Sequence, residues 1–204
     1  MKCEYCEEIF AQKGALMKKM TIVVIALVAA MCLAGCSEVA IERDTLSILE
    51  DGTASYTIIS DFSDPSYNLN ELLDMAQEEV QNYGDGVAIT EAVVEKGVLN
   101  FVYTFGSLSD YADFMSTSCF YGTVAQALQE GFKSDTQLIS AKDRSTVSIG
   151  SDKLKKYRLF VWNEAVSVRC DGNVLYHSAN LKVSDKTDVH PASDAAGPYY
   201  VIFK

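Results

Sequence analysis

Basic residues, histidine and proline are scarce in this sequence. It has 17 Lys and Arg residues against 28 Asp and Glu residues, and its formal net charge of −11 argues against nucleic-acid binding, which requires a basic surface. The same charge disfavours electrostatic adsorption to anionic lipid head groups. Only two histidines are present, which excludes a multi-histidine metal site. With three prolines and 49% hydrophobic residues, the chain is neither disordered nor collagen-like.

Motifs of the common enzyme classes are missing too. The sequence has no G-x-S-x-G, H-E-x-x-H, P-loop or G-x-G-x-x-G pattern. His177, in an expected strand, and His190, in an expected loop, are interpreted as ordinary half-exposed side chains. Carboxylates are numerous, so a pair at glycosidase distance can arise on folding. We therefore expect a protein that is not an enzyme and has no cofactor or metal, with an envelope hydrolase that uses a carboxylate pair as the alternative.

The region before residue 37 carries the strongest pattern of the chain. Lysines in Met17-Lys18-Lys19-Met20 precede an uncharged apolar run from Thr21 to Met31, and Leu33-Ala34-Gly35-Cys36 closes it. The run is shorter than the roughly 20 residues that span hydrocarbon stably. It is therefore typical of a signal peptide, with small residues at the cleavage site. The order resembles the lipobox of bacterial lipoproteins, in which cleavage precedes the cysteine and its thiol takes a diacylglyceryl group.

This resemblance implies the domain organisation. Residues 1–35 form an N-terminal extension and a signal peptide that is removed, and residues 36–204 form one extracytoplasmic globular domain anchored at Cys36. The partner implied is the cell membrane, through the lipid on that cysteine. Cys3-x-x-Cys6 in the extension could be half of a zinc or redox site, but no second pair follows at ligand spacing.

Hydrophobic periodicity and turn residues predict the elements of the domain. Leu69, Leu72, Leu73, Ala76, Val80 and Tyr83 make one apolar stripe of a helix that Asn68 can cap and Gly84 can end. The other expected helices cover 110–115, with Ser107 or Ser109 as the cap, and 123–130. Expected strands cover 39–49, 53–60, 87–94, 98–105, 157–162, 165–170, 174–178 and 199–203, and 182–198 is expected to be an irregular loop.

The order of these elements predicts the fold class. Strand pairs precede and follow helices instead of alternating with them one by one. Asp51-Gly52 and Glu95-Lys96-Gly97 are hairpin turns by composition. We expect an α+β fold with a mainly antiparallel β-sheet and two or three helices packed on it.

Two stretches are similar to the LppM-type domain of bacterial lipoproteins. One is the hairpin Leu46-x-Ile48-x-x-Asp51-Gly52-x-Ala54-x-Tyr56. The other is the order that follows, in which a helix and a strand pair lead to Phe105-Gly106-Ser107-Leu108-Ser109-Asp110 and another helix. The resemblance spans roughly residues 39 to 180. It implies a non-enzymatic domain that binds a lipid-like ligand or an envelope protein.

Two residue groups are candidates for a role in the mature domain. The aromatic residues Phe101, Tyr103, Phe105, Tyr111 and Phe114 can line an apolar pocket if the helices cover the sheet incompletely, and otherwise they form core. Cys119 and Cys170 are an exported pair of thiols, so they are candidates for a disulfide. The alternative is two buried, reduced cysteines that pack as small hydrophobic residues.

Overall fold

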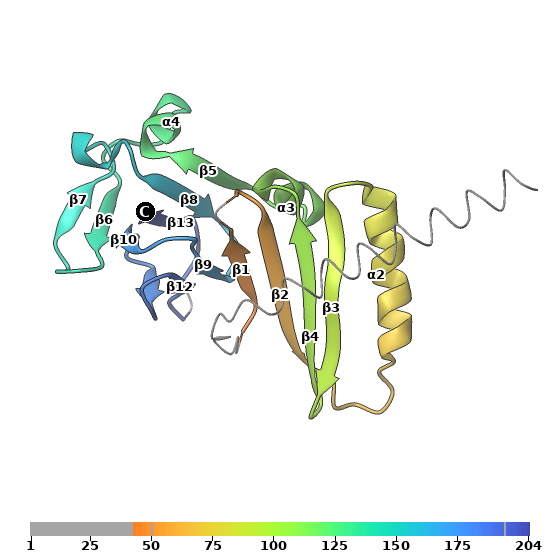
Figure 1. The fold of residues 1–204 in the computed structure, drawn as a ribbon. Coiled ribbons are helices and arrows are strands. Elements are labelled where there is room, and N and C mark those ends of the chain that lie inside the picture. Colours follow the sequence, from red (N-terminus) through yellow and green to blue (C-terminus); the bar gives the residue numbers. More distant parts are fainter. Residues whose placement is uncertain (1–42, 50, 194) are drawn as a thin grey trace, which may run out of the picture. The chain divides into compact units, whose positions relative to one another are not determined.

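The computed structural model describes residues 43–49, 51–193 and 195–204. In this part of the chain thirteen strands and three α-helices form two antiparallel-dominated sheets, which confirms the predicted α+β class. The strands divide between two sheets where the sequence suggested one (Figure 1).

The first sheet has seven strands in the order β11-β12-β9-β1-β2-β4-β3. Its neighbours are antiparallel except for β1 and β9, which run parallel. The strands are β1 (Thr45–Ile48), β2 (Ala54–Asp61), β3 (Val87–Glu95), β4 (Val98–Phe105), β9 (Ser167–Arg169), β11 (Leu181–Val183) and β12 (Asp188–Pro191). The sheet therefore joins the first third of the domain to its end.

The second sheet has six strands, all paired antiparallel, in the order β5-β8-β13-β10-β6-β7. They are β5 (Cys119–Thr123), β6 (Gln137–Ser140), β7 (Thr146–Ser148), β8 (Arg158–Trp162), β10 (Val174–His177) and β13 (Tyr199–Phe203). A short 3-10 helix, η1 (Asp152–Leu154), precedes β8.

Three predicted helices and two predicted turns are confirmed. The helices are α2 (Leu69–Tyr83), α3 (Leu108–Phe114) and α4 (Val124–Gln129), and the side chains of Asn68, Ser107 and Thr123 cap them. Lys96 and Gly97 have φ values of 51° and 80°, so both central residues of the β3–β4 turn have the positive φ of a tight hairpin. At the start of α2, the Asn68 side-chain amide also donates a hydrogen bond to the Glu71 carboxylate at 3.2 Å.

The core is built on both faces of the six-stranded sheet. Phe160 and Trp162 of β8 point into the larger cluster, which also holds Leu46 of β1 and Phe105 of β4, so the two sheets share that core. Leu159 and Val161, on the opposite face of β8, pack with α4 and η1. A strand that is buried on both faces has a continuous apolar sequence, as Leu159–Trp162 of β8 does.

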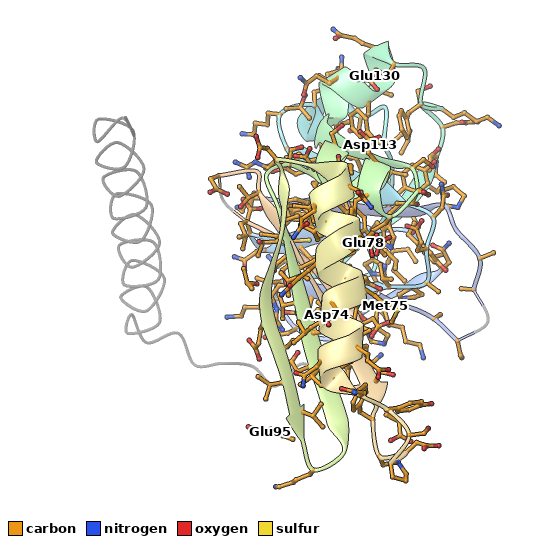
Figure 2. All side chains as sticks on the ribbon, turned by 90° about the vertical axis from the view of Figure 1, so that its right-hand side faces the viewer. Asp74, Met75, Glu78, Glu95, Asp113 and Glu130 are labelled. Atoms are coloured by element: carbon orange, nitrogen blue, oxygen red, sulfur yellow. The ribbon has the colours of Figure 1, made fainter. Side chains whose placement is uncertain are left out.

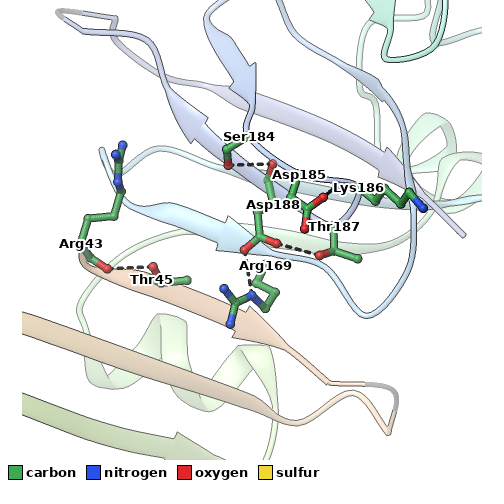
Figure 3. A network of polar contacts seen from close by, with 8 residues as sticks. All are labelled: Arg43, Thr45, Arg169, Ser184, Asp185, Lys186, Thr187 and Asp188. Atoms are coloured by element: carbon green, nitrogen blue, oxygen red, sulfur yellow. Dashed lines mark hydrogen bonds and ion pairs between the residues drawn. The ribbon is translucent and has the colours of Figure 1, made fainter. Parts of the chain in front are cut away.

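The interpretation of residues 182–198 as an irregular loop is wrong. The segment forms the end of β11 and all of β12, and Asp188 fixes β12 to its neighbour (Figure 3). Asp188 Oδ1 accepts from Arg169 Nε at 2.8 Å, and its Oδ2 accepts from the Thr187 hydroxyl at 2.7 Å. The short strands β6 and β7 were also missed, because Gln137–Ser140 and Thr146–Ser148 show no clear alternation of apolar and polar side chains.

Candidate functional site

A groove lies between the first half of α2 and the strands β2 and β4. Its volume is about 480 Å³. Helix α2 runs alongside β3 and β4 (Figure 1) and leaves part of the neighbouring sheet surface uncovered. The lining residues are Ile58, Ser60 and Asp61 of β2, Leu99, Phe101 and Tyr103 of β4, Glu71, Leu72 and Met75 of α2, and Phe62, Ser66, Tyr67 and Asn68 of the segment that joins β2 to α2.

The floor of the groove is apolar because of the strand register. Ile58 pairs with Phe101 and Ser60 pairs with Leu99 across β2 and β4, so these side chains share one face of the sheet. The rings of Phe101 and Tyr103 pack with their centroids 4.9 Å apart and their planes tilted by 50°. Leu72 of α2 closes the groove from the helix side. The site is therefore a mainly apolar concavity with a few polar groups, as small-molecule sites commonly are.

The segment before α2 forms one wall. The backbone N–H of Phe62 donates to the Gly97 carbonyl at 2.7 Å, which ties the segment to the β3–β4 turn. The Phe62 and Tyr67 rings lie 5.3 Å apart. Tyr67 is 55% exposed and Met75 is 64% exposed, although both are large apolar side chains. Both side chains are therefore accessible from the solvent at the groove.

Two of the five aromatic residues predicted to line a pocket line this groove, and the other three do not. Phe101 and Tyr103 line the groove. Phe105, Tyr111 and Phe114 do not, because α3 covers that end of the sheet. Tyr111 meets Phe105 edge-on at 5.4 Å, and Phe114 packs on Tyr103 and Phe105. These three residues pack in the core beneath α3 and do not line this groove, although Phe105 also lines a separate cavity beside the start of β3.

The rim of the groove is acidic. Asp61 and Glu71 line it, and the exposed side of α2 carries Asp74 and Glu78 beside Met75 (Figure 2). Hydrogen bonds from Ser63 lower the pKa of the Asp61 carboxyl, so it stays ionised at neutral pH. The mouth of the groove thus has negative charge over an apolar floor.

A second group of ionisable side chains lies near α3, where Tyr56 is buried and Glu164 is half-buried. Burial raises the pKa of Glu164, and one of its carboxylate oxygens has no hydrogen-bond partner among the described residues. Burial, with the charges of Asp44 and Glu164, raises the pKa of Tyr56 to about 12. Glu164 lines none of the cavities described here.

The two cysteines of the folded part are free thiols. Cys119 lies in β5 of the six-stranded sheet, whereas Cys170 directly follows β9 of the other sheet. Burial raises the pKa of Cys119 to about 11 and raises that of Cys170 further. The structure therefore does not support the disulfide, and of the two thiols Cys170 is buried whereas Cys119 is half-buried.

The interpretation of the histidines needs correction. His177 ends β10 and is 2% exposed, so it is buried instead of half-exposed. His190 lies in β12 and not in a loop.

Within the described ranges, no group of three or more His, Cys, Asp or Glu side chains is placed to hold a metal ion. No helix in those ranges is long and apolar enough to cross a membrane.

The lipobox falls outside the described residues. This holds for the whole of residues 1–35 and for Cys36, so lipidation and signal cleavage stay predictions. Comparison with protein families, with curated proteins and with solved structures finds no match to this chain. The resemblance to LppM-type lipoproteins is therefore also untested.

Proposed function

We propose that this chain is an envelope lipoprotein, anchored through a diacylglyceryl group on Cys36, that binds the apolar part of an amphiphile in the groove between α2 and the β2–β4 strands. The observation that carries the proposal is the groove itself. It places Phe101 and Tyr103 beneath an opening flanked by exposed Met75 and Tyr67. Burying apolar ligand surface there yields about 25 cal/mol per Å².

The charge of the rim restricts the class of head group. Asp61 and Glu71 stand at the groove, and Asp64 lies two residues before Ser66 of its wall. An anionic head group would be repelled by these carboxylates. A neutral head group or one that carries an amine is compatible with them. The proposed ligand is therefore a single-chain or lipid-like amphiphile with a zwitterionic, neutral or cationic head.

The proposed lipid anchor on Cys36 supports an amphiphilic ligand, because it would place the domain at the membrane. A lipid on Cys36 would hold the folded part beside the membrane, where amphiphiles are concentrated. Replacing Cys36 with alanine should abolish incorporation of labelled palmitate and leave a longer precursor. Cys32→Ala is the matched control, because Cys32 lies in the apolar run and not at the cleavage position. Label in the Cys36→Ala protein would contradict the anchor.

The groove can be tested without removing core side chains. Leu72→Trp places a larger ring in the groove, and Leu73→Trp makes the identical change at a neighbouring half-buried position of α2 that does not line it. The full chain, purified in mild detergent after exposure to membrane extract, is analysed by native mass spectrometry. A covalent anchor survives collisional activation, whereas a ligand in the groove is released.

The expected result is a releasable lipid-sized mass in the wild type and in Leu73→Trp, and its loss in Leu72→Trp. If the wild type has no such mass, or if both variants keep it equally, the groove is not the binding site.

The hydrolase alternative rests on one observation, the presence of both Asp61 and Glu71 in the groove. The lowered pKa of Asp61 suits a nucleophile or a base, and Glu71 would then be the acid. Release of soluble sugar from cell-wall glycan by the wild type and not by Asp61→Asn would support the alternative. If the wild type releases no soluble sugar, the hydrolase alternative is excluded.

A further inference from the structure

A second cavity of about 640 Å³ lies away from the groove, where β6 and β10 of one sheet approach β11 and the end of β12 of the other. Most of its lining is apolar, from Ile139, Ala141, Ala179, Leu181, Val183 and Ala192. Its polar side chains come from three separate segments. Arg144 belongs to the β6–β7 turn, His177 ends β10, and Lys182 lies in β11.

The charge of this cavity is opposite to that of the chain. The protein carries 28 acidic residues against 17 basic ones, yet two basic residues and no Asp or Glu appear among the lining residues. Neither Arg144 nor Lys182 belongs to an ion pair within the described part of the chain. Two cations that face one cavity without a carboxylate form a local site of positive potential.

Two more basic side chains, those of Arg43 and His190, lie near Lys182. His190 is its partner across β11 and β12, so the two side chains are neighbours. Burial, together with the charges of Arg43 and Lys182, lowers the pKa of His190. Arg43 therefore also contributes to the positive potential on this side of the sheet. Asp188, the acidic residue closest to His190 in β12, is already paired with Arg169 (Figure 3).

His177 supplies a third polar group. Its Nδ1 lies 2.9 Å from the Ser178 carbonyl oxygen, which can only accept, so Nδ1 carries the hydrogen. Its Nε2 is buried and has no hydrogen-bond partner among the described residues. Buried polar atoms are nearly always paired in folded proteins. The unpaired nitrogen of a histidine that lines the cavity thus points to a missing partner.

We propose that this cavity binds a phosphate monoester, with Arg144, Lys182 and His177 as its ligands. Three groups converge there, and a phosphate monoester has three terminal oxygens, whereas a carboxylate has two. Near neutral pH such a phosphate exists with and without a proton, because its second pKa is about 6. It can therefore donate to a neutral His177 Nε2 or accept from a protonated one. The apolar lining would contact the organic part of the ester.

The site can be tested with variants of exposed residues, since His177 is buried and its replacement endangers folding. The full chain in detergent is titrated with glycerol 3-phosphate and followed by calorimetry. Arg144→Gln and Lys182→Gln should each weaken binding by about tenfold, the effect of removing one charge-assisted hydrogen bond. Lys186→Gln removes the same charge from the β11–β12 turn outside the cavity and should leave the affinity unchanged (Figure 3).

Two further measurements separate the ligand's source and class. Vesicles of phosphatidylcholine with and without phosphatidic acid test whether the phosphate belongs to a lipid. If the protein binds vesicles that contain phosphatidic acid but not glycerol 3-phosphate, and Arg144→Gln and Lys182→Gln weaken this binding, the site is supported and the phosphate comes from a membrane lipid. In the wild type, the nitrogen NMR signal of His177 Nε2 should shift on binding.

The proposal is overturned if neither phosphate probe binds, or if Lys186→Gln loses as much affinity as Lys182→Gln. Tighter binding of glucuronate than of glycerol 3-phosphate would overturn the phosphate assignment. None of these results depends on the apolar groove.

Discussion

Helix α2 and strand β13 bury very different shares of their residues. Ala76 is the one fully buried residue in the fifteen of α2. Four of the five residues of β13 are buried, because this strand lies in the middle of the second sheet between two apolar clusters. The comparison shows where the molecule has room for a ligand. A helix held by a half-buried stripe leaves a groove, whereas a strand covered on both faces leaves none.

The largest effect is expected in the second sheet. Phe160 of β8 is fully buried and stacks on Trp162 at 5.1 Å, so Phe160→Ala should lower the free energy of unfolding by about 3–5 kcal/mol. Denaturant unfolding of the full chain measures this. A loss below about 1 kcal/mol would mean that the tightly packed sheet does not dominate stability.

A smaller loss is expected for a side chain on the buried side of α2. Leu73 is only partly buried against the core, so Leu73→Ala should lower the free energy of unfolding by about 1–2 kcal/mol. The same denaturant experiment applies. An effect as large as that of Phe160→Ala would show that α2 is held as tightly as the strands, and it would argue against a groove that opens easily.

The next smaller loss of stability is expected from removing the N-cap of α2. The Asn68 side-chain oxygen accepts from the backbone N–H groups of Asn70 at 3.0 Å and Glu71 at 3.5 Å. Asn68→Ala should therefore lower the free energy of unfolding by about 1 kcal/mol. Asn70→Ala serves as the control, because Asn70 lies inside the helix and caps nothing. Equal losses in the two variants would show that the cap contributes nothing to the helix.

How far the sequence predicts this fold depends on local signals. Helix α2 was predicted at its observed bounds, because an apolar stripe, an N-cap and a terminal glycine coincide within one segment. Strand β5 was missed because its five residues are all half-buried and show no alternation, so its pairing with β8 is decided by residues far along the chain.

The candidate sites divide in the same way. The apolar strand face of the groove could be read from the alternation of Leu99, Phe101, Tyr103 and Phe105. The sequence does not show which end of this strand face α3 covers, because that depends on tertiary packing. The second cavity gave no sequence signal, because its polar residues Arg144, His177 and Lys182 come from the β6–β7 turn, β10 and β11.

The smallest stability effect depends on pH and concerns the half-buried carboxyl of Glu164. A raised pKa in the folded state favours the protonated form, so its stabilising contribution is present below the ordinary Glu pKa of about 4.3 and is lost as pH rises through the folded-state value. Glu164→Gln should therefore gain thermal stability over the wild type as pH rises from about 4 to neutral. Exposed Glu130→Gln should follow the wild type at every pH (Figure 2).

The groove between α2 and the β2–β4 strands is tested most directly by methionine methyl NMR. Met75 lies at the groove, and Met115, 36% exposed after α3, does not line it. The full chain is titrated with lysophosphatidylethanolamine, whose amine-bearing head group is compatible with the acidic rim. The Met75 methyl signal should shift to saturation while that of Met115 stays in place. Equal shifts of both signals, or none at Met75, would contradict binding in the groove.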